Sequence, residues 1–174
     1  MSADFLIDNL RVTDLPSVLS IQSESYPGYL VESRQVFLSR LSLKNSCCLA
    51  AREGELLLGY MIAHGWQADD PPPLGIVVEM AEQSDVLFIH DLAVSNSGRG
   101  RGIGKKLVEH AFDCARSKGM TVAQLVAVEG ATRYWRGLGF TEAQTAGNLR
   151  AKVREYGADA RWMSRLIPAG STNS

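Results

Sequence analysis

The stretch that decides the fold reads VLFIHDLAV over residues 86–94 and continues SNSGRGRGIGKK over residues 95–106. Its first part is a run of mostly β-branched and apolar residues bounded by polar turn residues, which predicts a buried strand. After the glycine-rich loop, apolar residues recur at helical spacing, at Ile103, Leu107, Ala111, Phe112 and Ala115. A strand, a basic glycine-rich loop and a helix indicate a phosphate site, because the first N–H groups of the helix point outward and glycines let an anion approach the backbone.

Two common phosphate loops do not fit these residues. A P-loop needs a glycine where this chain has Arg99 and a hydroxyl where it has Lys106, so the metal ligand of magnesium nucleotide chemistry is missing. A dinucleotide fingerprint needs Gly-x-Gly-x-x-Gly, but the glycines at positions 98, 100, 102 and 104 alternate and never complete it.

The remaining pattern, Arg99-x-x-Gly102-x-Gly104, resembles the acetyl-CoA pyrophosphate loop of the GCN5-related N-acetyltransferases, the GNAT superfamily. The strand end at residues 91–94, a second expected strand at 121–128, and an Ala-x-x-aromatic segment ending in Gly-Phe at 131–140 extend the resemblance over residues 86–140. The first half of the chain is similar in layout more than in motif. The resemblance implies an α/β single-domain GNAT fold over residues 1–168, with a mixed, mostly antiparallel sheet and flanking helices. We expect residues 169–174 to be a disordered tail.

The composition agrees with one ordinary domain. The chain has 174 residues, of which 45% are hydrophobic and 21% charged, enough for one substantial core. A net charge of −1 and a pI near 6.3 indicate no general attraction to nucleic acid or to an anionic membrane. No apolar run reaches membrane length and the first residues lack the features of a signal peptide, so we expect a cytoplasmic protein.

Further elements are predicted outside the central stretch. Helices are expected after the cap at residues 13–16, from about Glu32, and over 149–155, and strands over 5–12, 47–52, 56–64 and 160–167. The connection from 65 to 85 contains three consecutive prolines and is predicted to be an extended surface loop, with a possible short strand at 76–79. Its role, as a lid or as a contact in a homodimer, is left open.

The cysteines show no metal-type spacing. Cys47 and Cys48 are adjacent in an expected strand, and Cys114 lies in the helix after the loop. We predict that all three are small buried apolar residues, and that the protein has no metal site.

The resemblance also implies the residues that hold acetyl-CoA, the expected co-substrate. Main-chain groups of Leu92, Ala93 and Val94 would bind the thioester carbonyl and the pantetheine arm. The loop backbone would take the pyrophosphate, through Arg99, Gly100, Arg101, Gly102, Ile103, Gly104 and Lys105.

His90 is the candidate general base. It precedes Leu92 by two residues on the expected strand, so both side chains should point to one face. An imidazole with a pKa near 6.5 accepts a proton at neutral pH. The strand around His90 is similar to that of the arylalkylamine N-acetyltransferases, in which a histidine at the matching position is the base, although Phe88 stands where those enzymes have another histidine. The alternative is a buried, hydrogen-bonded histidine without a catalytic task.

The largest departure from the family pattern is Trp135, which stands where the proton-donating tyrosine is expected, with Tyr134 one residue earlier. An indole N–H does not transfer a proton at useful pH. Either Tyr134 turns into the role, or Trp135 only packs on the cofactor, or no acid is used, since a thiolate with a pKa near 8.5 can leave without one. Adjacent helical positions diverge by about 100°, so Tyr134 is expected to be a packing residue and is kept only as a candidate acid.

We expect the acceptor pocket over the first helices, lined by Tyr26, Tyr29 and Trp66, with ordinary packing as the alternative. The predicted function is direct transfer of acetyl from acetyl-CoA to a primary amine, small and possibly aromatic. Acetylation of a protein N-terminus or lysine, and a non-catalytic acyl-CoA sensor, remain alternatives.

Overall fold

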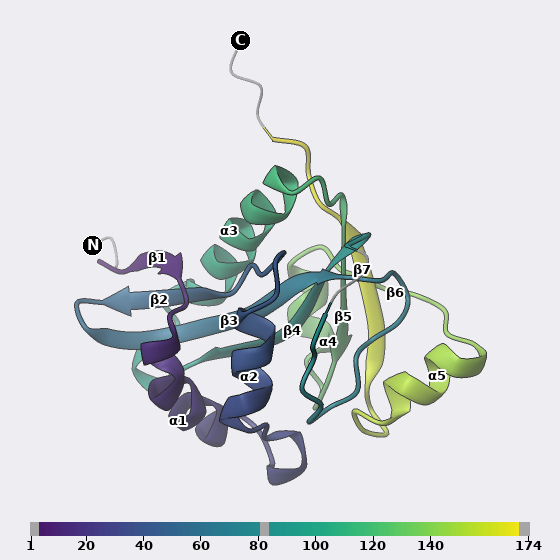
Figure 1. The fold of residues 1–174 in the computed structure, drawn as a ribbon, viewed down its shortest axis with the longest axis horizontal. Coiled ribbons are helices and arrows are strands. Elements are labelled where there is room, and N and C mark those ends of the chain that lie inside the picture. The colour runs from purple at the N-terminus through teal and green to yellow at the C-terminus, as the bar shows by residue number, and fades with distance from the viewer. Residues whose placement is uncertain (1–3, 81–83, 171–174) are drawn as a thin grey trace.

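The central strand of the sheet, β4 (Val86–Val94), is buried along most of its length and separates two differently paired halves. The computed structural model describes residues 4–80 and 84–170. Its seven-stranded sheet has the order β1-β2-β3-β4-β5-β7-β6 (Figure 1). The other strands are β1 (Leu6–Asn9), β2 (Leu49–Glu53), β3 (Leu56–Trp66), β5 (Val122–Ala127), β6 (Thr141–Glu142) and β7 (Arg161–Leu166).

Only β4 and β5 pair in parallel among the described strands, and the other five pairings are antiparallel. This confirms the predicted mixed, mostly antiparallel α/β fold. The β2–β3 hairpin turns at Gly54, as expected from the sequence. The two-residue strand β6 was not predicted, because a strand so short leaves no periodic pattern.

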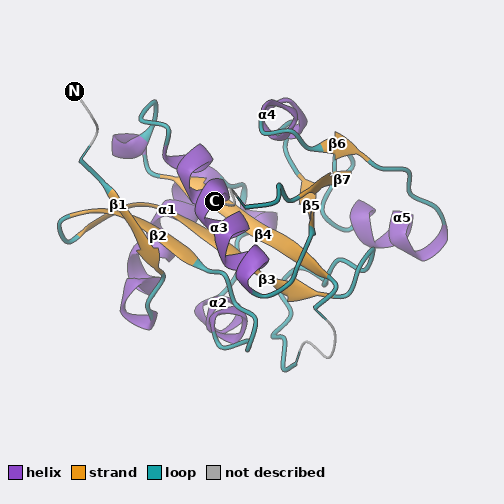
Figure 2. Cartoon of the chain, turned by 90° about the horizontal axis from the view of Figure 1, so that it is seen from above, coloured by secondary structure: helices purple, strands orange, loops and turns teal. Residues whose placement is uncertain are grey.

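Helices cover both faces of the sheet (Figures 1 and 2). Helix α3 packs on one face, and α1 and α2 pack on the other. The helices are α1 (Leu15–Ser25), α2 (Arg34–Leu41), α3 (Ile103–Ser117), α4 (Thr132–Gly137) and α5 (Gly147–Arg154), with single turns η1 (Val12–Asp14), η2 (Gly28–Leu30) and η3 (Asn96–Gly98). All five apolar residues predicted for the face of α3 are buried against the sheet.

A bulge interrupts the pairing of β3 with β4. Ile62 pairs with Asp91 while its neighbour Ala63 pairs with Ile89, so His90 has no opposite residue on β3. One extra residue in one strand shifts the alternation of side chains beyond it. Ile89 therefore packs into the core under α3, and so does Leu92 three residues later, whereas Ala93 packs under α1.

Three expectations need correction or stay untested. Residues 76–79 form no strand, because they run as irregular chain past α2. The prediction of three free cysteines is wrong: Cys47 and Cys114 form a disulfide that ties the start of β2 to α3, and Cys48 alone is a free, buried thiol. Adjacent strand residues point to opposite faces, so only one of the first two cysteines can reach α3. Residues 171–174 lie outside the described part, so the tail stays a prediction.

Candidate active site

A cavity of about 440 Å³ opens where β4 and β5 separate. The two strands pair only from Leu87 to Ile89, while β4 continues to Val94. Within the described chain no other strand pairs with this edge of β4, so the alternate main-chain groups of residues 90–94 that point to this edge have no strand partner. The cavity continues from this split to the first turn of α3 on one side and to α4 on the other.

The loop end of the cavity is built from glycine backbone. Gly102 caps α3 in the left-handed conformation at φ 74°, which favours glycine because it has no Cβ. A Cβ placed on Gly100 or Gly102 meets no atom within 4 Å, so the backbone there is open to a ligand. The first N–H groups of a helix have no partner within it, and the helix dipole adds positive charge. This end therefore suits a phosphate group.

The basic side chains of the loop divide between two sides. Arg99 and Lys105 line the cavity and form no ion pair with any residue that the structure describes. Arg101 instead pairs with Glu53 at 3.1 Å and lies over the ring of Phe5, on the far side of the loop. Its side chain therefore does not reach the cavity, and only its main chain can serve the loop.

Tyr134 and Trp135 occupy different environments on α4. Trp135 is buried and packs edge-on against Phe140, although one part of it reaches the cavity wall. Tyr134 is 47% exposed and its hydroxyl lies against Gly104, so closely that a Cβ at position 104 would overlap it. Burial raises the pKa of Tyr134, so its hydroxyl keeps its proton at neutral pH. Of the two residues, Tyr134 is the one that presents a transferable proton to the cavity.

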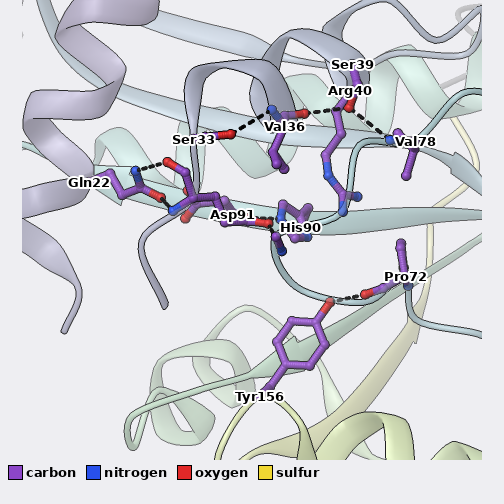
Figure 3. A network of polar contacts seen from close by, with 12 residues as sticks. Gln22, Ser33, Val36, Ser39, Arg40, Pro72, Val78, His90, Asp91 and Tyr156 are labelled. Carbon is purple, nitrogen blue, oxygen red and sulfur yellow. Dashed lines mark hydrogen bonds and ion pairs between the residues drawn. The ribbon is translucent and has the colours of Figure 1, made fainter. Parts of the chain in front are cut away.

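The opposite end of the cavity holds a buried pair, Glu32 and His90, of which Figure 3 labels His90. His90 Nε2 bonds Glu32 Oε1, and the two side chains are 1% and 5% exposed. Glu32 lies in the segment between η2 and α2. The Gln22 side chain holds its main chain through two hydrogen bonds of 2.8 and 3.0 Å. Gly75 N–H donates to Glu32 Oε2 at 2.8 Å, so the carboxylate has partners on both oxygens.

The electrostatics of this pair favour a neutral imidazole beside an ionised carboxylate. Burial lowers the pKa of His90 and Arg40 lowers it further, against the opposing effect of Glu32. Burial by itself would raise the pKa of Glu32, but the bonds from His90 and Gly75 reverse that and leave it lowered. An ionised carboxylate only accepts, so His90 Nε2 carries the proton and Nδ1 keeps its lone pair. Nδ1 is buried and has no hydrogen-bond partner among the described residues, so its lone pair is unoccupied.

The predicted acceptor residues are placed unequally. Tyr26 lines the cavity and donates its hydroxyl to the carbonyl of Leu92 at 2.8 Å. Tyr29 is 59% exposed and bonds Glu129, and Trp66 packs near α5 with its indole N–H on the carbonyl of Asp70 at 2.8 Å. Neither of these two lines the cavity. Ala93 points away from it, under α1, so only its main chain can contribute.

The proline-rich connection forms the outer wall of the acceptor end. Its Asp69 bonds Gln124 of β5 and Trp162 of β7, and Asp70 pairs with Lys152 of α5. Leu74 and Tyr156 line the cavity, and the Tyr156 hydroxyl donates to the carbonyl of Pro72 at 2.5 Å (Figure 3). With the bond from Val78 N–H to the Ser39 hydroxyl, the segment 69–78 is thus fixed to β5, β7, α5 and α2. That leaves its function as a lid or dimer contact a prediction.

Sequence reasoning missed Glu32, Arg40, Leu74 and Tyr156. Each comes from a segment without a motif, and only the fold brings them to His90. Across residues 4–80 and 84–170 there is no cluster of three metal-ligating side chains. No helix in that part of the chain is long and apolar enough to cross a membrane.

Comparison with known proteins agrees with this geometry. The model of the Acetyltransferase (GNAT) family matches residues 15–140. An uncharacterized N-acetyltransferase of Methanocaldococcus jannaschii is 35% identical over 92 residues, which cover 47% of this chain and 41% of that protein, so the match spans less than half of the relative.

Solved structures share the fold over nearly the whole chain. Ard1 from Thermoplasma volcanium has a TM-score of 0.72 at 17% identity, covering 96% of this chain and 100% of that one. The ribosomal-protein-S18-alanine N-acetyltransferase of Escherichia coli has a TM-score of 0.65 at 20% identity, covering 98% of each chain. Arabidopsis thaliana Naa50, in complex with the bisubstrate analogue CoA-Ac-MVNAL, has a TM-score of 0.66 at 16% identity, covering 94% of this chain and 99% of that one.

Proposed function

The chain belongs to the acetyltransferase (GNAT) family, and we propose that it transfers the acetyl group of acetyl-CoA directly to a primary amine. The observation that carries the proposal is one continuous cavity with the basic, glycine-rich loop at one end and the buried His90–Glu32 pair at the other. A ternary complex fits this layout, because both substrates would meet at the split between β4 and β5.

The residues at the loop end fit acetyl-CoA. When bound, acetyl-CoA supplies the activated acetyl thioester. The open backbone at Gly100 and Gly102, the first turn of α3 and the side chains of Arg99 and Lys105 would hold the pyrophosphate. Main-chain groups of residues 92–94 that point to the open edge of β4 would orient the pantetheine arm and the carbonyl. The Leu92 carbonyl accepts the Tyr26 hydroxyl, so Tyr26 fixes this part of β4 rather than only lining the pocket.

His90 is the general base of this proposal. An alkylamine is protonated at pH 7, so a proton has to leave it before attack. The free Nδ1 of His90 would accept that proton, while Glu32 holds the opposite nitrogen and fixes the ring. Tyr134 would then donate to the departing thiolate, since its hydroxyl keeps its proton at neutral pH and points into the cavity.

The lining of the acceptor end supports a small amine with an apolar body. Its walls include Leu30, Leu74, Val126 and Val128, and two acidic residues, Glu32 and Asp91, line it beside His90. An uncharged apolar group suits such walls, and the Glu32 carboxylate would attract the ammonium form before its proton is lost. The likeness of β4 to arylalkylamine acetyltransferases points to the same class of acceptor but stays a prediction.

Acetylation of a protein N-terminus is the second candidate. Two of the similar structures are an S18-alanine N-acetyltransferase and a complex with CoA-Ac-MVNAL. The same acceptor end would take the α-amino group and first apolar side chain of a peptide. The segment 69–78, with Tyr156 behind it, restricts the room beyond that side chain.

The test is CoA release from acetyl-CoA with arylalkylamines, aliphatic amines, polyamines, amino acids, a Met-first peptide and lysine peptides. Turnover with apolar amines that falls in His90→Ala supports the proposal, and preference for the Met-first peptide selects the second candidate. CoA binding by calorimetry without turnover on the whole panel would contradict an enzyme and favour a sensor. Light scattering of the purified protein tests the predicted homodimer.

A further inference from the structure

Arg40 of α2 is a fully buried cation that the mechanism above does not use. Its side chain is 0% exposed, and its Nη1 lies 2.8 Å from Nε2 of His64. Its Nε and Nη2 are buried and have no hydrogen-bond partner among the described residues. Figure 3 shows it reaching from α2 toward His90. No carboxylate in the described chain lies within ion-pair distance of it.

This arrangement destabilises the fold and therefore needs a reason. A buried charge without an adjacent counter-ion costs several kcal/mol on the usual scale, and unsatisfied donors add to it. An apolar residue of similar length would avoid that cost. A charge retained in such a place is more often functional than structural, because low-dielectric surroundings carry its field to nearby titrating groups.

Several polar and titratable side chains from neighbouring strands and loops surround Arg40. His64 of β3 accepts the Arg40 hydrogen bond at Nε2 and faces the Gly65 carbonyl with Nδ1 at 3.1 Å, so it is neutral; burial and Arg40 lower its pKa to about 3. Phe88 lies between the two imidazoles, with centroid distances of 6.0 Å to each. The other polar or titratable groups that interact with Arg40 are Glu32, Cys48, Asp91 and Tyr156.

We propose that Arg40 is a positioning residue that keeps His90 neutral beside the Glu32 carboxylate, so that Nδ1 stays a proton acceptor throughout the working pH range. This rests on the proposed role of His90 as base. Glu32 alone would draw a proton onto His90, because an imidazolium and a carboxylate in contact attract strongly in a buried site. Arg40 opposes that second proton from the other side. The two charges thus have separate tasks: Glu32 selects which nitrogen is protonated, and Arg40 limits the ring to one proton.

Loss of the Arg40 charge should change the pH dependence of activity, whereas loss of a merely structural buried residue usually lowers activity at every pH. Without the Arg40 charge, only burial would oppose protonation, so the pKa of His90 should rise and more of the ring should be protonated as an ion pair with Glu32 at a given pH. Activity should then fall near pH 7 and recover at higher pH, where that proton dissociates. A merely structural Arg40 would instead lower activity and stability alike at every pH.

The first experiment compares Arg40→Gln and Arg40→Met with the charge-conserving Arg40→Lys and the wild type. The acid limb of kcat/KM with the best acceptor amine should move up by about one pH unit or more in the two neutral variants, as expected for removal of one nearby charge. Arg40→Lys should lie nearer the wild type. Equal loss at all pH values, or a KM increase confined to acceptors that bear a carboxylate, would overturn the proposal.

A second measurement does not depend on turnover. The protein has three histidines, so imidazole signals can be followed by NMR and assigned with single His→Gln variants. His90 should remain neutral down to lower pH in the wild type than in Arg40→Gln, in the absence of any substrate. If this holds while no amine is acetylated, Arg40 acts as proposed and His90 is not a catalytic base. If His90 titrates at the same pH in both proteins, the inference is wrong even if the chain is an acetyltransferase.

Discussion

The two ends of the cavity are built in different ways. The loop end is made from consecutive residues, from Leu92 to Lys105, and its chemistry is that of main-chain N–H groups and glycines. The acceptor end joins side chains from residues 26 to 156. Its chemistry depends on the protonation of four buried groups, which are Glu32, Arg40, His64 and His90. Local backbone geometry makes the first end robust to changes elsewhere. The second depends on long-range packing and on charge balance.

The largest effect is expected at the acceptor end, from removing its base. His90→Ala should lower kcat about 1000-fold, within the range that general bases contribute, and leave the acetyl-CoA dissociation constant unchanged. Initial rates and calorimetry check both numbers, with His110→Ala as the control, since His110 is exposed on α3. A matching loss of acetyl-CoA affinity would show that the two ends are not separate.

Removing the disulfide tests whether the loop end keeps its geometry without long-range support from the rest of the fold. Cys114→Ser should lower the free energy of unfolding by about 4 kcal/mol, because the bond closes a loop over a sequence separation of 67 residues. Denaturant titration measures this, with Cys48→Ser as the control for a free buried thiol. Acetyl-CoA affinity should stay the same, since the first turn of α3 does not involve position 114. A loss of acetyl-CoA binding free energy as large as the loss of stability would show that the disulfide is needed to form the acetyl-CoA site.

The pH dependence of stability tests whether the buried His64, next to the acceptor end, is held in its neutral form. His64 has a pKa of about 3 in the folded protein against 6.5 in a free chain, so it favours the folded state above pH 6.5 and loses that contribution as pH falls toward 3. Between pH 7 and pH 5 the wild type should lose about 2 kcal/mol relative to His64→Gln. Urea unfolding at the two pH values measures the difference. An equal loss in both proteins would show that His64 is not held neutral.

The smallest effect concerns the contact between α3 and α4. Gly104→Ala should weaken acetyl-CoA binding about fivefold, because the new methyl group displaces the Tyr134 hydroxyl and costs about 1 kcal/mol. The overlap involves mainly the hydroxyl, so the same change in a Tyr134→Phe background should have almost no effect. A double-mutant cycle on the dissociation constant checks this. Additive effects would mean that the hydroxyl does not lie over Gly104.

The loop end of the cavity could be predicted from the sequence far better than the acceptor end. The strand, loop and helix over residues 86–117, the β2–β3 hairpin and the mixed sheet were predictable, because their signals are local periodicity and glycine placement. Leu92, Arg99, Gly102 and Tyr134 line the cavity, and their roles in binding and catalysis stay predictions. His90 also lines it, although the identity of its partner could not be predicted.

The remainder could not be predicted because it depends on which distant residues meet. Nothing near Glu32 distinguishes it from a surface glutamate, and only the bonds from Gln22 and Gly75 place it against His90. The disulfide was missed for a similar reason, since its cysteines are far apart in the sequence and carry no spacing motif. Tyr29 and Trp66 were expected in the pocket from their aromatic character alone, and they lie outside it.

The bulge at His90 divides β4 into two segments whose alternation differs in phase. Before it, odd-numbered Leu87 and Ile89 face the core under α3; after it, even-numbered Leu92 and Val94 pack on that side. A single averaged period over residues 86–94 therefore describes neither segment. Deleting His90 would restore a regular ladder and leave its neighbours on their present faces, because Ile89 already lies opposite Ala63 and Asp91 opposite Ile62. The bulge is thus how β4 carries one additional side chain into the cavity lining without disturbing the pairing on either side, and a designer who copied the strand with ideal geometry would keep the sheet and lose that side chain.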